Sequence, residues 1–457
     1  MTSTNNLKLV TKMKLWQKDT AALKEVETFT VGKDREMDLY LAPFDVLGSM
    51  AHTRMLESVG LLDKKDLADL QSALKDIYQQ IIKGEFTLQD NVEDIHSQVE
   101  LLLTQKLGDA GKKIHSARSR NDQVLVDIKL FLRSEIEAMV HAILPFFELL
   151  QTQSDKFKDH LYPGYTHLQL AMPSSFGLWF GAYAEGLVDD MLTLKAAFEV
   201  VNKNPLGSAA GYGSSFPINR QMTTDLLGFS SLNYNVVYAQ MGRGKAERIV
   251  AQALANIADT LSRLSMDMTL YLNQNFAFVS FPAELTTGSS IMPHKKNPDV
   301  FELIRSHCNR IKALPNEIAM MTTNLPSGYH RDLQLLKEHL FPAFKALKDC
   351  IEMAGLMLSN IDIKKDILAD EKYKYLFTVD LVNQMVLQGV TFRDAYIQVG
   401  RSVEDGTYKV PEQTSVSNPH EGAIQNLCTK EIKSLMDKVV SDFDFGKVHE
   451  AIKGLLQ

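Results

Sequence analysis

The sequence predicts an all-α protein in which three helical domains include a central bundle of long helices. Apolar residues recur at helical spacing over long stretches, whereas the alternation of apolar and polar residues that is typical of strands is scarce. At roughly 100–200 residues per domain, the 457 residues of the chain provide for about three domains. We place these at residues 1–117, 118–363 and 364–457, and the second holds the bundle.

The helical pattern is strongest in the middle of the chain. One apolar series alternates spacings of four and three residues, which is a heptad seam suited to long, nearly parallel helices. It consists of Val250, Leu254, Ile257, Leu261, Leu264 and Met268. Because no proline lies between Pro217 and Pro282, one very long helix could fit in that region.

A second long helix is predicted earlier in the chain, where Pro145 should kink it or end it. Its apolar positions are Leu125, Ile128, Leu132, Ile136, Met139, Ile143, Phe147 and Leu150. A shorter helix, with Gly84 as its stop, is marked by Leu67, Leu70, Leu74, Ile77 and Ile81.

Helices of this length also bear on assembly. A helix of about 35 residues extends roughly 50 Å, and its apolar stripe must be covered over that whole length. Further copies of the chain would cover such stripes more fully than one chain folding back on itself. We therefore expect an oligomer, and a monomeric helical bundle is the alternative.

The composition argues against several classes of protein. A net charge of -7 offers nucleic acid or an anionic membrane no general attraction. Cys308, Cys350 and Cys428 lie far apart, which disfavours a disulfide framework or a zinc site and favours a reducing, cytoplasmic setting. The chain shows no secretory signal, no membrane-spanning run and no glycine-rich nucleotide motif, so we expect neither a membrane anchor nor a cofactor.

Residues 115–122 (HSARSRND) are the first of three polar segments that interrupt the helical pattern, and they stand at the start of a long helix. Backbone N–H groups at a helix start attract anions, and Arg118, Arg120 and Asn121 add donors for a carboxylate. A helix cap followed by a solvated basic turn would explain the same residues.

The second polar segment is residues 163–169 (PGYTHLQ). Pro163 and Gly164 indicate a turn, after which Thr166, His167 and Gln169 supply a hydroxyl, an imidazole and an amide. Histidine is the commonest general acid or base near neutral pH. The alternative is a histidine that caps a helix by bonding to the backbone.

The third polar segment is residues 287–298 (TGSSIMPHKKNP), in which glycine and two serines give flexibility and two prolines bracket a cationic cluster. Such a loop can close over an anionic ligand and exclude water, which strengthens each charge contact inside. A solvated basic turn is the alternative, although a simple turn rarely needs so many residues of this kind.

Two further groups are weak on their own. Asp94 and His96 could cap a helix or touch a ligand. Tyr329, Gln334 and Lys337 are five and three residues apart, which places them close to one helix face. Packing at the surface or at an interface would account for either group.

Together these segments resemble a known family. Residues 288–298 match the signature Gly-Ser-Ser-x-Met-Pro-x-Lys-x-Asn-Pro of the fumarase/aspartase superfamily without a gap, and residues 166–169 match its Thr-His-Leu-Gln block. Residues 117–123 resemble the Ser-Arg-Ser-Arg-Asn-Asp-Gln block of argininosuccinate lyases in particular. Residues 93–96 and the spacing of Tyr329, Gln334 and Lys337 are also similar to that family, and the blocks occur in its order.

The resemblance implies a carbon–nitrogen lyase that splits argininosuccinate into arginine and fumarate, the last step of arginine biosynthesis, without a cofactor or a metal. It also implies three domains per chain and a homotetramer in which each active site draws on three subunits.

The family pattern also implies roles for single residues. Ser289 is placed as the catalytic base, and His167, paired with Glu302, as the second catalytic group. Lys295 and Asn297 are placed on a substrate carboxylate, and Lys295 counts as catalytic because its charge would stabilise the forming dianion. The other implied substrate contacts are Ser119, Arg120, Asn121, Thr166, His96, Tyr329, Gln334 and Lys337.

The sequence departs from the family pattern in four places. Residues 15–19 (LWQKD) and 29–32 (FTVG) replace Trp-Gly-Gly-Arg-Phe and Phe-Asn-x-Ser, which help to hold the amino-acid end of the substrate. His294 stands where glutamine is usual, and residues 241–245 (MGRGK) are altered. These differences leave the residues for the elimination in place.

Two other functions compete with this one. Adenylosuccinate lyase, aspartase or fumarase would share the signature loop, but residues 119–123 and the group of Tyr329, Gln334 and Lys337 argue against them. A catalytically silent structural homologue would keep the fold alone, yet Ser289 and His167 are both present.

Overall fold

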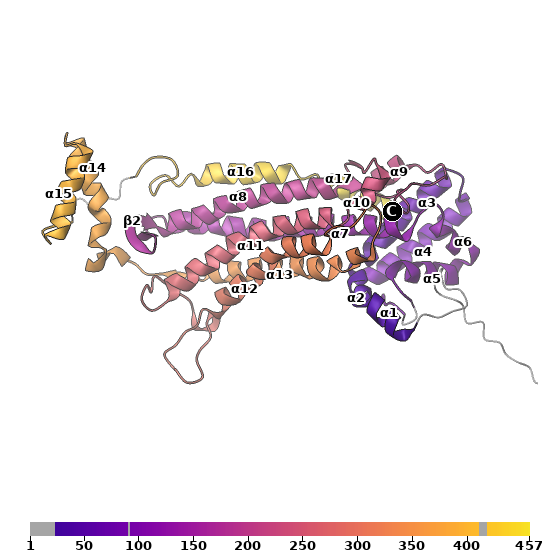
Figure 1. The fold of residues 1–457 in the computed structure, drawn as a ribbon, viewed down its shortest axis with the longest axis horizontal. Helices are drawn as coiled ribbons and strands as arrows, with labels where there is room; N and C mark the ends of the chain where they lie inside the picture. The colour runs from indigo at the N-terminus through magenta and orange to yellow at the C-terminus, as the bar shows by residue number, and fades with distance from the viewer. Residues whose placement is uncertain (1–22, 90–91, 411–417) are drawn as a thin grey trace, which may run out of the picture.

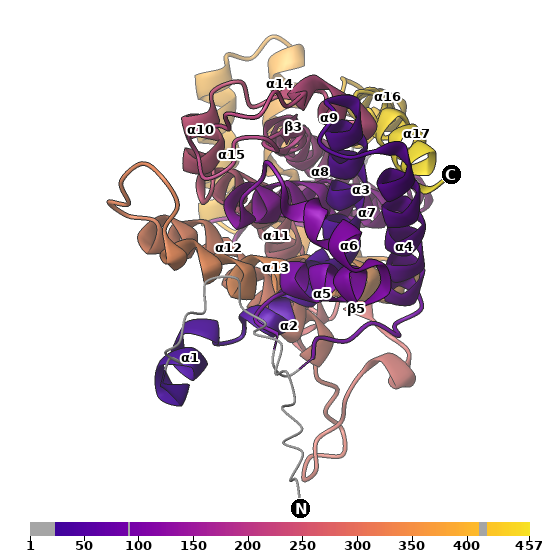
Figure 2. The ribbon, with the colours of Figure 1, turned by 90° about the vertical axis from the view of Figure 1, so that its right-hand side faces the viewer.

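The structure is a computed structural model that describes residues 23–89, 92–410 and 418–457. Helices dominate the described residues, and their strands form three two-stranded pairs. The long helices run side by side along the long axis of an elongated molecule, and the N-terminal helices gather at one end (Figures 1 and 2). The prediction of an all-α fold is confirmed.

The N-terminal region packs around its own apolar cluster, which includes Met50, Leu74 and Leu103. Its elements are α1 (Lys24–Val31), α2 (Asp34–Asp38), η1 (Leu39–Leu41), α3 (Ala42–Ser58), α4 (Lys64–Ile82), α5 (Ile95–Leu107), α6 (Asp109–Lys112) and η2 (Lys113–His115). Helix α4 is the predicted short helix, and the φ of 72° at Gly84 just past its end confirms the predicted stop.

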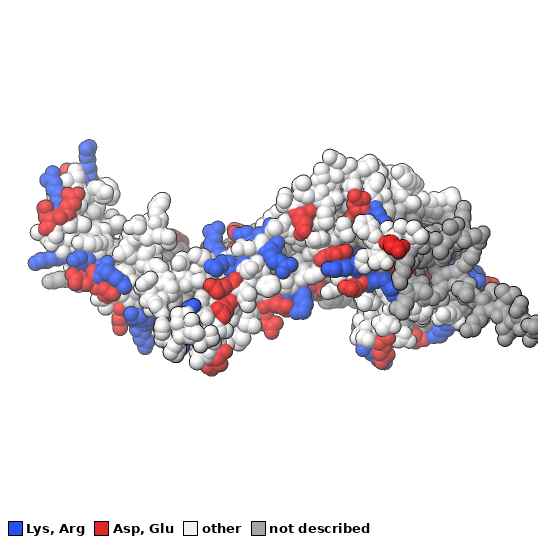
Figure 3. Space-filling view, turned by 60° about the horizontal axis from the view of Figure 1, so that its bottom comes forward, with Lys and Arg blue, Asp and Glu red and all other residues white. Residues whose placement is uncertain are grey.

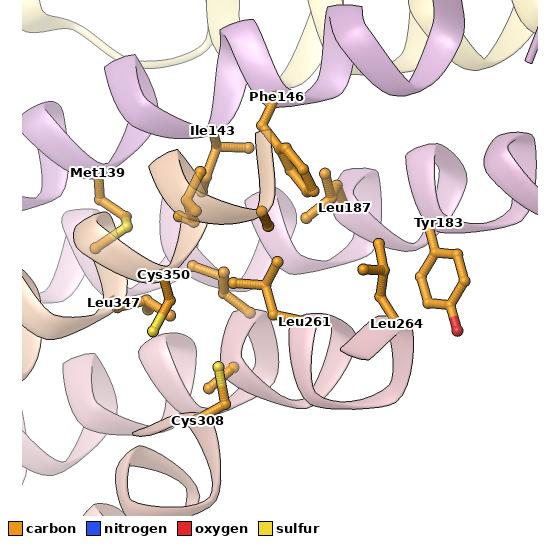
Figure 4. Close-up of a cluster of buried hydrophobic side chains, with 14 of the residues drawn as sticks. Met139, Ile143, Phe146, Tyr183, Leu187, Leu261, Leu264, Cys308, Leu347 and Cys350 are labelled. Carbon is orange, nitrogen blue, oxygen red and sulfur yellow. The ribbon is translucent and has the colours of Figure 1, made fainter. Parts of the chain in front are cut away.

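Five long helices form the central bundle. They are α7 (Arg120–Lys156), α8 (Phe176–Val201), α11 (Lys245–Leu272), α12 (Asp299–Met321) and α13 (Leu336–Ser359). Figure 4 shows Ile143 of α7, Leu187 of α8 and Leu261 of α11 meeting in the shared core, with Cys308 of α12 and Cys350 of α13 beside them as free thiols. Within the described residues, no helix combines the length and the apolar character needed to cross a bilayer.

The heptad seam lies on α11, and all six of its residues have 0% exposure within the single chain. The predicted helix is confirmed there, and α8, α12 and α13 pack against it. This seam therefore needs no second copy to cover it. The helix is shorter than the space between Pro217 and Pro282 allows, because Gly244, at a φ of 75°, separates α11 from α10 (Val236–Met241).

Pro145 does not end α7, which continues to Lys156. Proline removes one backbone hydrogen bond and crowds the carbonyl four residues earlier, which here belongs to His141. His141 and Pro145 are both exposed, so water can satisfy that carbonyl. Ile143 and Phe147 are fully buried on the other side and hold both halves of the helix in the core.

The polar segment at residues 163–169 lies in a β-hairpin that the residue pattern did not predict. Strand β1 (Leu161–Thr166) pairs antiparallel with β2 (Gln169–Ser175), and its register shifts between Pro163 and Tyr165. A proline fits a strand at such an irregularity, so the predicted proline–glycine turn was wrong. The turn consists of His167 and Leu168, whose φ values of 55° and 56° suit a two-residue hairpin connection.

Short elements connect the long helices. Strand β3 (Lys203–Asn204) pairs parallel with β4 (Ser231–Leu232), and β5 (Val279–Ser280) pairs antiparallel with β6 (Asp362–Ile363). The others are α9 (Arg220–Leu226), η3 (Ala283–Leu285), η4 (Arg331–Gln334), η5 (Ile367–Ala369) and η6 (Glu371–Phe377).

The last part of the chain divides between two places. Helices α14 (Thr378–Leu387) and α15 (Phe392–Glu404) form a small pair at the far end of the molecule (Figure 1), with a separate apolar cluster that includes Val382 and Val399. Helix α16 (Thr429–Ser441) returns along α8, and α17 (Phe445–Leu456) packs against α9 and α3. The domain division after residues 117 and 363 stays a prediction.

A buried histidine in the N-terminal region makes stability depend on pH. His52 on α3 is 1% exposed, and its Nε2 lies 2.8 Å from the carbonyl oxygen of Ser116. Burial, reinforced by the nearby guanidinium of Arg118, lowers the pKa of His52 from its ordinary 6.5 to about 3. The unfolded chain therefore takes up a proton as the pH falls through 6.5, while the folded chain does so only near pH 3.

We predict that wild-type stability falls as the pH drops below 6.5, by up to about 1.4 kcal/mol per pH unit from this group. His52→Gln keeps a donor for Ser116 and should flatten the dependence of the urea midpoint on pH between about pH 4 and 6.5. His141→Gln, on the exposed face of α7, is the matched control and should leave the slope unchanged. An unaltered slope in the His52 variant would contradict this account.

Candidate active site

A cavity of about 260 Å³ lies where the N-terminal helices meet the bundle. The starts of α7 and α13 reach it from the bundle, and α2 and α5 reach it from the N-terminal region. Four cationic and four acidic side chains line it, so it suits a ligand that carries charges of both signs. The lining residues are Val31, Asp34, Asp38, Glu93, Asp94, His96, Ser97, Arg120, Asn121, Val124, Arg243, Tyr329, Arg331, Gln334 and Lys337.

Six of the predicted substrate contacts line this one cavity, although they come from segments far apart in the sequence. They are His96, Arg120, Asn121, Tyr329, Gln334 and Lys337. Ser119 directly precedes two of them in the chain. The structure thus brings together the residues of three separate family blocks, and their part in substrate binding stays a prediction.

The start of α7 is held by a capping box. The Oγ of Ser119 accepts a hydrogen bond from the Asn121 N–H at 3.3 Å, and the carboxylate of Asp122 accepts one from the Ser119 N–H at 2.9 Å. Asp122 also accepts from the backbone N–H groups of Gly207 and Ala209. The prediction that residues 115–122 stand at the start of a long helix is confirmed, and the helix cap of the alternative interpretation is also present.

The guanidinium of Arg120 is fixed by acidic neighbours on α5. It forms an ion pair with Asp94, and its Nη2 lies 3.7 Å from the carboxylate of Glu100. Burial alone would raise the pKa of Asp94, but the charges of His96 and Arg120 and a hydrogen bond from the Ser97 N–H lower it to about 2. Asp94 is therefore ionised at neutral pH and holds Arg120 at the cavity wall.

Lys337 is 4% exposed and forms ion pairs with Asp34 and Asp38 of α2. Burial and repulsion from Asp38 raise the pKa of Asp34 to about 6, against the attraction of Lys337. The two carboxylates more than balance the single ammonium group. This end of the cavity therefore favours a ligand group that is positively charged or donates hydrogen bonds.

Residues 29–32, where the chain departs from the family pattern, contribute Val31 to the cavity wall. The side-chain amide of Gln334 donates to the carbonyl of Thr30 at 2.9 Å, and Arg331 donates to the same oxygen at 3.1 Å. The main chain beside Val31 thus holds two side chains of the cavity wall in place. The departure at residues 15–19 lies outside the described residues.

Arg243, from the altered segment at residues 241–245, also lines the cavity. Its Nε lies 3.2 Å from the Glu247 carboxylate, and its Nη2 donates to the Leu333 carbonyl at 2.9 Å. The sequence had marked this segment as altered, but nothing in it indicated that its arginine would face the substrate contacts.

A buried group of polar side chains lies behind His96. Its Nδ1 lies 2.8 Å from Oδ1 of Asp45 and 3.6 Å from Oδ2 of Asp127. The amide of Gln123 donates to the same Asp45 oxygen at 2.6 Å. None of these partners was among the predicted site residues. The signal available in the sequence was a lone acidic residue on an otherwise apolar helix stretch, at Asp45 and again at Asp127.

Three potential metal-ligand atoms, from Asp45, His96 and Asp127, lie within 4.8 Å of one another. One oxygen of Asp45 already accepts hydrogen bonds from both His96 and Gln123. The buried guanidinium of Arg118 interacts with both carboxylates and opposes a further positive charge. We therefore interpret the group as a hydrogen-bonded cluster and not as a metal site.

The second polar segment lies at the other end of the bundle. Thr166 ends β1, and His167 is exposed at the tip of the hairpin. A positive φ is uncommon for a residue with a side chain, and strained backbone of this kind gathers at functional sites. The alternative of a helix-capping histidine is wrong, because His167 lies between two strands.

The third polar segment is an exposed loop between η3 and α12, and it extends away from the bundle (Figure 1). The Asn297 N–H donates to the Thr287 carbonyl at 2.9 Å and closes the base of the loop. Within it, the Oγ of Ser289 accepts a hydrogen bond from the Met292 N–H at 3.1 Å. Lys295 is exposed. The prediction of a long polar loop is confirmed.

His167 and Glu302, which the family pattern pairs, form no ion pair with each other among the described residues. Glu302 is exposed on the first turn of α12. The 37 residues of α7 rise roughly 55 Å, with Arg120 at the start and His167 beyond the end. Ser289 likewise lies beyond the far end of α11. One chain therefore keeps its predicted catalytic groups a bundle length away from the cavity.

Comparisons with known proteins identify the family of the chain. A family model described as "Lyase" matches residues 7–313. An argininosuccinate lyase of Bacteroides fragilis is 59% identical over 443 residues, which cover 97% of this chain and 99% of the relative. An argininosuccinate lyase of Stenotrophomonas maltophilia is 36% identical over 92% of this chain and 98% of its own length.

Solved structures share the fold. A crystal structure of EDDS lyase in complex with formate has a TM-score of 0.76 at 21% identity and covers 96% of this chain and 95% of its own. A class II fumarase from Schistosoma mansoni has a TM-score of 0.68 at 16% identity, over 86% of this chain and 95% of its own. From the family model and the identity over nearly the whole chain, this chain belongs to the argininosuccinate lyase family of lyases.

Proposed function

We propose that this protein catalyses the reversible elimination of argininosuccinate to L-arginine and fumarate. The observation that carries the proposal is the cavity, in which contacts predicted from three separate family blocks converge with balanced charge. Argininosuccinate has an amino-acid end with both signs of charge, a guanidinium group and a succinyl half with two carboxylates. A small cavity with paired acidic and basic walls suits its amino-acid end.

The acidic side of the cavity is suited to the cationic groups of the arginine half. Asp34 and Asp38 outnumber the ammonium group of Lys337. Arg120 and Arg243 supply guanidinium groups for carboxylates. The succinyl half then needs a second set of cations, which the loop containing Lys295 offers.

The reaction requires removal of a proton next to a carboxylate, which produces a doubly charged aci-carboxylate. Catalysis must stabilise this developing charge more than it stabilises the substrate. Lys295, Asn297 and the backbone N–H groups of the closed loop can do so electrostatically. The positive charge of Lys295 makes the alkoxide of Ser289 reachable, and its Oγ then takes the proton and becomes a hydroxyl; a positioned base contributes about 10²–10⁴-fold. The C–N bond then breaks and arginine leaves, while His167 protonates the leaving nitrogen or orders the site.

The proposal includes an oligomer with shared active sites. Two observations support it: the cavity and Ser289 lie at opposite ends of the bundle within one chain, and the bundle helices expose large apolar side chains. Leu192 on α8 is 51% exposed and Leu303 on α12 is 62% exposed. A homotetramer, in which three chains contribute to each site, satisfies both.

A small-molecule substrate also suits the surface better than a polyanion does. Acidic and basic side chains intermingle over the face drawn in Figure 3, and the net charge of the chain is -7. Three free thiols favour a reducing compartment such as the cytoplasm.

We predict that the purified protein releases fumarate, seen by its ultraviolet absorbance, from argininosuccinate. Adenylosuccinate, malate and aspartate should give no signal above that of a Ser289→Ala control, because the cavity is built for a guanidino amino acid. Release of fumarate from one of those three substrates, but not from argininosuccinate, would reassign the activity within the superfamily. If none of the four substrates yields fumarate, the proposed function is contradicted.

We also predict that two inactive variants restore each other. Arg120→Gln damages the cavity, and Ser289→Ala removes the proposed base, so each alone should lose nearly all turnover. After co-expression with two different tags and purification through both, about a quarter of the sites should be intact, because half of the cavities and, independently, half of the loops are wild type. The doubly substituted chain is the control and should stay inactive. Recovery no greater than that of the control would show that the site does not combine chains.

A further inference from the structure

We propose that Asp45 is a positioning residue for His96 and that Asp127, the second carboxylate beside the same imidazole, is not. His96 lines the cavity, whereas both aspartates lie behind it with 0% exposure. The inference rests on the proposed lyase function and extends it to a residue that touches no substrate.

The hydrogen bonds around Asp45 define its part. Its Oδ1 lies 2.8 Å from the Nδ1 of His96 and 2.6 Å from the side-chain nitrogen of Gln123. A carboxylate accepts and does not donate, so Nδ1 carries the hydrogen and Nε2 is left for the cavity. Because Gln123 donates to the same oxygen, one fixed atom sets the position of the imidazole and keeps a hydrogen on its Nδ1.

Asp127 is placed differently. Its Oδ2 is 3.6 Å from Nδ1 of His96, which is beyond a good hydrogen bond. Both of its oxygens and Oδ2 of Asp45 are buried without a donor among the described residues. A proton on Asp127 would donate to Asp45 and supply the missing bond. Burial and repulsion from Asp45 raise the pKa of Asp127 well above its usual range. Burial also acts to raise the pKa of Asp45, but attraction to His96 and Arg118 outweighs it and lowers that pKa.

We therefore predict that an aspartate-to-asparagine substitution has opposite effects at positions 127 and 45. An asparagine at position 127 copies the neutral acid, since its amide can donate to Asp45, and fumarate release should stay within about twofold of wild type. An asparagine at position 45 removes the charge that holds His96. Hydrogen bonds to charged groups are strong enough that KM should rise about tenfold. The kcat should change by less than about threefold, because the lost interaction serves binding in the ground state and the transition state alike.

A double-mutant cycle separates positioning from a general loss of structure. His96→Asn keeps a donor for Asp45 but removes the ring that reaches the cavity. If Asp45 acts through His96, adding Asp45→Asn to His96→Asn should change KM by less than about twofold. Circular dichroism and the thermal midpoint verify that each variant is folded.

Several results would overturn the inference. They are a wild-type KM in Asp45→Asn, a full tenfold rise of KM in both backgrounds, or a loss in Asp127→Asn as large as that in Asp45→Asn. The last is also the result expected of a cation held by both carboxylates. Should Asp45→Asn fail to fold, Asp127→Asn still tests the second half of the inference, that Asp127 does not position His96. A wild type that releases no fumarate would refute the proposed function instead, so the two failures are distinguishable.

Discussion

The length of the bundle helices is the constraint on which the proposed site depends. Helix α7 alone carries the chain roughly 55 Å, from the cavity at one end to the hairpin with His167 at the other. The loop with Ser289 also lies at that far end, beyond α11. Helix α7 is continuous and packs into a buried core, which keeps its two ends apart. Chemistry that needs both ends therefore needs more than one chain.

The cationic side chains that line the cavity are each paired with a nearby acceptor. Each cation there has a fixed acidic or carbonyl partner: Arg120 has Asp94, Lys337 has two aspartates of α2, and Arg331 has the carbonyl of Thr30. Such pairs hold the cationic groups in place before a ligand arrives, which reduces the ordering that binding requires. The cationic loop at the opposite end has few such partners and projects from the bundle. In the proposed reaction, the succinyl half of the substrate, which becomes a dianion, meets this more adaptable loop.

The parts of the structure that the sequence predicted are those that depend on local pattern. The seam on α11 follows from the spacing of its apolar residues, and the start of α7 follows from the polar segment at residues 115–122. The long loop at residues 287–298 follows from its glycine, serines and prolines. Convergence of His96, Arg120 and Lys337 in one cavity could be expected only from family resemblance, because no local pattern links their segments.

The rest depends on contacts between distant segments. The hairpin was missed because Pro163 and Gly164 are common in turns, and only the partner strand shows that they lie in a ladder. Pro145 was expected to kink or end its helix, but the core holds α7 together on both sides of it. Arg243 and Asp45 reach the site through partners about ninety and fifty residues away, so their side chains gave no sign of this in the sequence.

A structure of the Ser289→Ala oligomer with argininosuccinate bound would test the central claim most directly. The account predicts that the arginine half lies in the cavity between Arg120 and Lys337 of one chain. The succinyl carboxylates should then meet Lys295 and Asn297 of a second chain, beside His167 of a third. Substrate enclosed by residues of a single chain, with the loop at residues 287–298 turned away from every bound molecule, would contradict it.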